Sequence, residues 1–148
     1  MSGLIERLED DLTESMKSRD EKRRDAVRLI LASLRSAEKD LQRPLNEGEE
    51  LQVLQRERKK RQEAAEAFRA AGSADRAAQE ETELAILGEY MPEPLSEEDL
   101  ESIIDDAIAE NGATNMRDLG RVMADVMPQV AGRADGSVVS QLVREKLA

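Results

Sequence analysis

Residues 116–147 read MRDLGRVMADVMPQVAGRADGSVVSQLVREKL, and this stretch decides the fold of the C-terminal part of the chain. Its apolar side chains recur every three or four residues, which is the spacing of one buried face of an α-helix. The pattern breaks at Pro128 and at the glycines of 132–136, and Asp135 is a typical N-cap residue. The stretch therefore predicts two helices, one from Thr114 to just before Pro128 and one from Asp135 onward, joined by a tight turn. The residues predicted to be buried are Met116, Leu119, Met123, Val126, Met127, Val138, Val139, Leu142, Val143 and Leu147.

The same spacing continues through the rest of the chain, so the sequence predicts an all-α protein. Asn46, followed three residues later by Glu49, has the spacing of a capping box that starts a helix. The expected N-terminal helices cover 3–18, 21–40, Asn46 to about Ala71, and a fourth segment after Gly72 that ends at Tyr90 and Met91. We expect them to pack as helical hairpins. The residues predicted to be buried in the first two are Leu4, Leu8, Leu12, Met16, Val27, Ile30, Leu31, Leu34 and Leu41.

The segment MPEPL at 91–95 is the best candidate for a domain boundary. Two prolines separated by one residue cannot lie inside a helix and hold the chain extended. Ser96 then has the character of an N-cap, and Leu95 can pack on Leu100 at the start of a helix that stops at Gly112. The sequence therefore predicts an N-terminal helical domain over 1–91 and a small C-terminal helical domain over 92–148.

The composition excludes several kinds of chemistry. The chain has no His, Cys or Trp, so it cannot use a catalytic imidazole, a thiolate nucleophile, a Cys/His zinc site or a disulfide. No apolar run approaches the roughly 20 residues that cross a bilayer, and the N-terminus lacks the pattern of a signal peptide. We therefore expect a cytoplasmic protein that is not inserted in a membrane.

The net charge of −11 argues against a general nucleic-acid binder, but the charges are unevenly distributed. Residues 92–110 carry eight acidic residues and no basic one, whereas residues 111–148 carry four acidic and five basic residues. The last helices therefore form the surface that repels phosphate least. The acidic residues of 97–106 are interpreted as the start of a helix, where the helix dipole favours carboxylates, and not as a metal site.

The segment RERKKR at 56–61 is the other concentration of positive charge. On a helix its basic residues spread around the axis, where neighbouring glutamates can pair with them. Arg58 and Arg61 nevertheless fall on the same helix face as Leu54 and Ala65. This suggests that the face emerges from the core, and is exposed to solvent, around these two arginines. Two interpretations stay open, a solvated helix with salt bridges and a patch that faces RNA.

The segment GRADGS at 132–137 also allows two interpretations. Glycines at the start of a helix leave backbone N–H groups free to hold a phosphate, with Arg133 beside them. Alternatively, Asp135 caps the helix and repels an anion, and the segment is only a tight turn between two helices.

Several motifs together resemble the GatB/YqeY family over nearly the whole chain. They are KRQEAAEAF at 60–68, LGEYMP at 87–92, LSEEDL at 95–100, GRVM at 120–123, GRADG at 132–136 and LVREKL at 142–147. The last three are the most specific and are similar to the tail domain of the GatB subunit of glutamine-dependent tRNA amidotransferase. The resemblance implies N-terminal helical hairpins followed by a small three-helix domain akin to that tail.

The resemblance also implies a contact with tRNA, because the tail domain is where the amidotransferase engages the body of its tRNA. The expected phosphate contacts are Arg121, Arg133, Arg144 and Lys146, with Arg58, Lys59 and Arg61 as a second patch. The partner would be tRNA or a complex of tRNA with aminoacylation or amidotransferase proteins.

No Gly-rich nucleotide loop and no glutaminase nucleophile arrangement is present in the sequence. We therefore expect an accessory tRNA-associated binding module with no catalytic residues, no metal and no cofactor. Two alternatives stay open. One is a protein-interaction adaptor that binds no RNA. The other is a component that supports tRNA-dependent amidotransferase activity, a carbon–nitrogen ligase reaction with glutamine as the amido donor.

Overall fold

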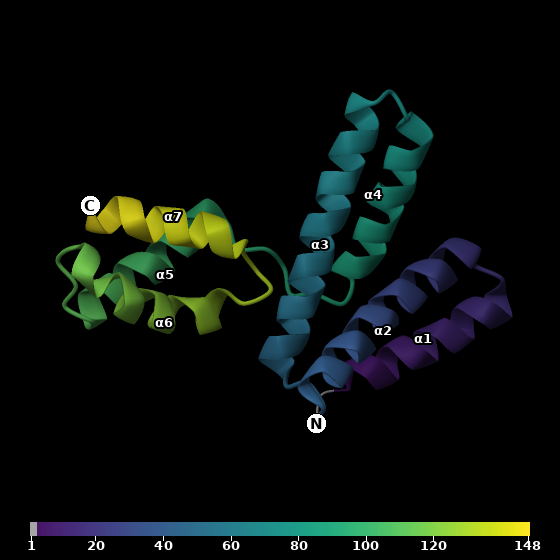
Figure 1. The fold of residues 1–148 in the computed structure, drawn as a ribbon, viewed down its shortest axis with the longest axis horizontal. Helices are drawn as coiled ribbons and strands as arrows, with labels where there is room; N and C mark the ends of the chain where they lie inside the picture. The colour runs from purple at the N-terminus through teal and green to yellow at the C-terminus, as the bar shows by residue number, and fades with distance from the viewer. Residues whose placement is uncertain (1–2) are drawn as a thin grey trace. The chain divides into compact units, whose positions relative to one another are not determined.

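The structure is a computed structural model that describes residues 3–148, and every regular element in that range is a helix (Figure 1). The all-α prediction is confirmed. The elements are α1 (Leu4–Ser18), α2 (Glu21–Leu41), α3 (Glu47–Ala70), α4 (Ala74–Gly88), α5 (Glu97–Glu110), the short 3₁₀ helix η1 (Met116–Asp118), α6 (Leu119–Val130) and α7 (Gly136–Leu147). The chain divides into an N-terminal unit that ends at Pro92 and a C-terminal unit, Glu93–Ala148.

In the N-terminal unit, α1 packs along α2 and α3 packs along α4, while α2 contacts both α3 and α4 (Figure 1). Leu8, Leu34 and Leu54 are fully buried at the centre of an aliphatic core. The capping box predicted at the start of α3 is confirmed, because Asn46 accepts a hydrogen bond from the Glu49 N–H and the Glu49 carboxylate accepts one from the Asn46 N–H. The start of α3 is therefore fixed by its own sequence.

In the C-terminal unit, α5, α6 and α7 enclose a second core whose central residues include the fully buried Ile104, Val122 and Val143. A tight turn joins α6 to α7, and Gly132 lies in it with φ 73°, a left-handed conformation that suits glycine. The Leu95 N–H donates to the carbonyl of Arg133 at 2.9 Å. This bond holds the segment that precedes α5 against the α6–α7 turn.

Pro128 does not end its helix, contrary to the sequence prediction. It lies in the last turn of α6, which continues to Val130. The fixed φ of proline is itself helical, so one missing N–H donor removes one hydrogen bond without stopping the helix. Val126 and Val130 are both fully buried, and their packing holds the last turn in place.

Five apolar residues that the spacing placed in the cores are instead exposed. They are Met16, Leu41, Met116, Met127 and Val138, each at least 36% exposed. Leu41 is the last residue of α2, Met116 begins η1, and Val138 lies in the first turn of α7, so three of the five lie at helix ends. The helix predicted from Thr114 also begins later than expected, at η1, where the Asn115 side chain accepts the capping hydrogen bond from the Arg117 N–H.

Candidate functional site

Basic residues gather at one end of the C-terminal unit. The chain reverses between α6 and α7, and α7 contacts both α6 and η1, so the end of α7 lies beside the start of α6 (Figure 1). This arrangement brings Arg121 of α6 to the same end as Arg144 and Lys146 of α7. Arg117, which was not among the predicted phosphate contacts, lies in η1 at this end as well. We call these four residues the basic end.

The side chains of the basic end differ in how they are held. Arg121 bonds to Asp118 and stays 59% exposed, while the Nζ of Lys146 lies 2.9 Å from Asp105 of α5. The Asp105 hydrogen bond and charge raise the pKa of Lys146. Arg144 donates to the Ser140 hydroxyl at 3.3 Å. Among residues 3–148, no carboxylate pairs with Arg117 or Arg144, so these two cations are the least neutralised.

Arg133 does not belong to this group, because it lies in the α6–α7 turn at the opposite end of the unit (Figure 1). Its Nε donates to the carbonyl of Glu93 at 3.3 Å, and its own carbonyl accepts from Leu95. Asp135 accepts hydrogen bonds from the N–H and the hydroxyl of Ser137, so a carboxylate already occupies the start of α7. The segment 132–137 therefore has the geometry of a tight turn and not of a phosphate cradle.

The second predicted patch lies on α3 in the N-terminal unit. Arg61 is only 19% exposed and contacts carboxylates from two helices, with Glu57 on α3 and Glu80 and Glu83 on α4. Burial lowers the pKa of Arg58, which is partly covered. Lys59 is exposed. Arg61 is therefore part of a packed charge cluster between α3 and α4.

Glu83 is the carboxylate of that cluster whose oxygen lacks a hydrogen-bond partner. Its Oε2 is buried and has no hydrogen-bond partner, although it lies 3.6 Å from the Nε of Arg61. Burial raises the pKa of Glu83, and the nearby Glu80 adds to the rise while Arg61 opposes it. One cation thus neutralises a group of carboxylates that would otherwise repel one another.

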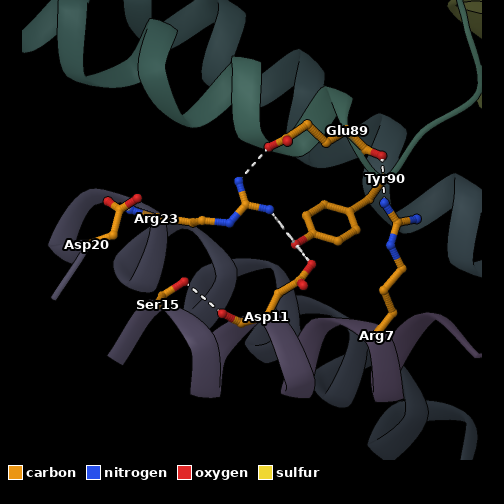
Figure 2. Close-up of polar contacts among 7 residues, drawn as sticks. All are labelled: Arg7, Asp11, Ser15, Asp20, Arg23, Glu89 and Tyr90. Atoms are coloured by element: carbon orange, nitrogen blue, oxygen red, sulfur yellow. Dashed lines mark hydrogen bonds and ion pairs between the residues drawn. The ribbon is translucent and has the colours of Figure 1, made fainter. Parts of the chain in front are cut away.

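A polar network fixes the residues that precede the link between the units (Figure 2). The Tyr90 hydroxyl donates to Asp11 of α1 and accepts from Arg23 of α2 at 3.2 Å. Arg23 also reaches the Glu89 carboxylate at 2.7 Å. The guanidinium of Arg7 lies 4.7 Å from the centre of the Tyr90 ring and donates to the Glu89 carbonyl.

The Tyr90 network is structural by its geometry. Tyr90 is 6% exposed, so substrate has little access to its hydroxyl. The network joins α1, α2 and the end of α4, and it includes two residues of the LGEYMP motif. The sequence pattern assigned Tyr90 no role of its own. The only feature of the local sequence that could have pointed to Tyr90 is that a single tyrosine stands close to the prolines between the two units.

We expect Tyr90 to ionise well above the ordinary range. Burial, with the Asp11 hydrogen bond and charge, raises the pKa of Tyr90 to about 12. A raised folded-state pKa means that the stabilisation is fully present below about pH 10 and is lost as pH rises toward 12. The near-ultraviolet absorbance of tyrosinate reads this residue alone, because the chain has one Tyr and no Trp. Titration near pH 10 in the folded protein, with circular dichroism unchanged, would contradict the network.

The described residues contain neither a metal-binding cluster nor a membrane-spanning helix. No group of three or more acidic side chains among residues 3–148 has the geometry to hold a metal ion. Among the helices of that range, none combines the length and the apolar character needed to cross a bilayer.

The chain is similar to known proteins along nearly its whole length. A family model described as Yqey-like protein matches residues 5–147. The chain is 27% identical over 145 residues, 96% of its length and 80% of the relative's, to altered inheritance of mitochondria protein 41, mitochondrial, of Pyrenophora tritici-repentis. Over 57 residues it is 44% identical to one of the subunits of the glutamyl-tRNA(Gln) amidotransferase of Thermococcus gammatolerans. That match covers 36% of this chain but only 9% of the relative, so the chain spans a small part of that protein.

Proposed function

The chain belongs to the YqeY-like protein family, and from that premise we propose that it is an accessory module that binds tRNA through its basic end and has no catalytic site of its own. The observation that carries the proposal is the grouping of Arg117, Arg121, Arg144 and Lys146 at one end of the C-terminal unit. Phosphate contacts from arginine and lysine provide most of the affinity for folded RNA that is recognised by shape.

The similarity to an amidotransferase protein supports a tRNA-linked partner. That relative is named for glutamyl-tRNA(Gln), and the chain is 44% identical to it over 57 residues. We propose tRNA, or an amidotransferase complex that carries tRNA, as the partner. The chain has only one Phe and one Tyr, so recognition of single strands by base stacking is disfavoured. A cytoplasmic location stays a prediction, since one relative has a mitochondrial name.

The geometry narrows the set of contact residues. Arg121, Arg144 and Lys146, with Arg117 beside them, are proposed to contact phosphate. Arg133 is left out because it is bonded to the backbone at the other end of the unit. The α3 patch of Arg58, Lys59 and Arg61 is left out because Arg61 is paired with carboxylates from two helices.

We expect the double variant Arg121→Gln/Arg144→Gln to weaken tRNA binding and to reduce its salt dependence. Each lost phosphate contact lowers the slope of log affinity against log salt by about one unit, so the slope should fall by about two. The measurement is fluorescence anisotropy of labelled tRNAs across a salt series. Asp118 keeps a hydrogen bond from the Thr114 N–H in this variant, so the fold should hold.

Arg28→Gln/Lys39→Gln is the matched control, since it removes two exposed cations of α2. It changes the net charge equally and should leave the slope unchanged. An equal loss in both double variants would assign the binding to net charge alone. The absence of binding at low salt in the wild-type protein would favour the protein-interaction adaptor.

A further inference from the structure

The N-terminal unit contains a groove that the proposed function does not use. It has a volume of about 620 Å³ and lies where the start of α1, the end of α2 and the start of α3 meet. Ile5 and Leu45 form part of an apolar wall. The ionisable groups that line the groove are all carboxylates, from Glu6, Glu38, Glu47 and Glu50.

Glu50 is the exceptional member of this set. It is only 4% exposed, and it lines the groove. Within residues 3–148 its carboxylate has no hydrogen-bond or ion-pair partner. The adjacent Glu49, by contrast, makes two bonds to Arg43 and closes the capping box. Arg43 is therefore already engaged by Glu49.

Most of the Glu50 side chain is covered by protein, but its carboxylate oxygens are not among the fully enclosed, unpartnered atoms of the described residues, so they reach solvent through the groove. The start of α3 gives Glu50 some support through the helix dipole, which is worth at most about 2 kcal/mol. That support is not directional, and the Glu50 N–H already donates to the Asn46 carbonyl. The side chain is thus arranged to meet a cation that enters the groove from outside.

We propose that this groove binds the side chain of a lysine from a partner protein. The ammonium group would pair with Glu50, and the other three carboxylates would add long-range attraction. The four-carbon stem of lysine would lie on Ile5 and Leu45, as long cationic side chains do on apolar surfaces. A metal ion is the weaker fit, since the acidic groups of residues 3–148 do not converge on a common point. The binding is independent of RNA.

Titration of the full chain with acetyl-Leu-Lys-Leu-amide, followed by amide NMR spectra, tests the proposal. We expect saturable shifts at the amides of Leu45 to Glu50 and of Ile5. The same peptide with norleucine in place of lysine has an equal apolar stem and no charge, so it should give no such shifts. Glu50→Gln should weaken the lysine peptide by about tenfold or more.

Glu97→Gln is the matched control, because it removes an exposed carboxylate of α5 and changes the net charge equally. It should leave the affinity unchanged. Glu50→Gln removes no contact made by the carboxylate within the described chain, so it should fold, and its circular dichroism and melting temperature check this. Equal binding by Glu50→Gln would overturn the proposal, as would equal shifts with norleucine. Saturation by butylamine at the peptide's concentration would overturn the assignment to a protein side chain.

Discussion

Replacement of Arg61 by methionine is expected to lower the free energy of unfolding of the N-terminal unit by about 3 kcal/mol near neutral pH. The nitrogen atoms of Arg61 lie 3.4 Å from an oxygen of Glu80 and 3.6 Å from oxygens of Glu57 and Glu83. Methionine keeps most of the apolar contact but removes the cation. Three largely covered carboxylates would then face one another without compensation.

The pH dependence of that loss distinguishes charge from packing. Burial already raises the pKa of Glu83, and removal of Arg61 would raise it further. Because the folded-state pKa is raised, the penalty is absent below the unfolded-state value and grows as pH rises. The difference between the variant and the wild-type protein should therefore shrink as pH falls toward about 4.5, the ordinary value for a glutamate. Urea unfolding of the variant and of the wild-type protein, near neutral pH and near pH 4.5, measures this difference in the free energy of unfolding.

Arg35→Met is the control for that experiment, because Arg35 pairs with Glu9 while both side chains are at least half exposed. An exposed pair contributes about 0–1 kcal/mol, so this variant should lose little. A loss at Arg61 no larger than at Arg35, or one that does not change with pH, would contradict a cluster held by charge.

The helices could be predicted from sequence because their start signals are local. The side chains of Asn46, Ser96 and Asp135 each accept a hydrogen bond from an N–H two or three residues later. The apolar spacing also identified buried residues of both cores, including Leu34 and Val143, but it missed the fully buried Val122 and Val130 of α6. The spacing mispredicted the burial of residues at helix ends. Burial at those positions depends on how far a neighbouring helix extends, and the spacing of apolar residues carries no information about that.

The candidate sites could be predicted only in part, because their partners are distant in sequence. Arg61 shares its helix face with Leu54 and Ala65, and the sequence suggested that this face leaves the core there. In the structure Glu80 and Glu83 of α4 instead contact Arg61, which is only 19% exposed. Arg121 and Arg133 looked equivalent in sequence, yet the reversal of the chain places them at opposite ends of one unit.

Glu50 is a second residue whose candidate role could not be predicted from the sequence. In sequence it is one of three glutamates near the start of a helix; Glu49 is predicted to complete the capping box, but nothing separates Glu50 from Glu47. In the structure Glu49 is bonded to Arg43, whereas Glu50 is largely covered and makes no side-chain hydrogen bond or ion pair within residues 3–148. The burial of a side chain and its partners depend on the tertiary structure. Glu50 could therefore be proposed as a binding residue only from the structure.

Ile104→Ala is expected to lower the free energy of unfolding of the C-terminal unit by about 2–5 kcal/mol. Ile104 is fully buried in the core of that unit, and alanine would leave a cavity among its valines. A unit that covers only Glu93–Ala148 is small, and units of this size have little stability to spare. We therefore expect a large part of it to unfold near room temperature. Ile104→Val, the matched control, should lose about 1 kcal/mol.

This variant also separates the two proposals, since the buried clusters of the two units share no residue. Ile104→Ala should lose tRNA binding with its C-terminal unit, yet keep the response of Leu45 to Glu50 to the lysine peptide. Hydrogen exchange should show lost protection at Val122 and Val143 and retained protection at Leu34. Equal loss of protection at Leu34 would mean that the cores unfold as one cooperative unit, and the division into two domains would then be wrong.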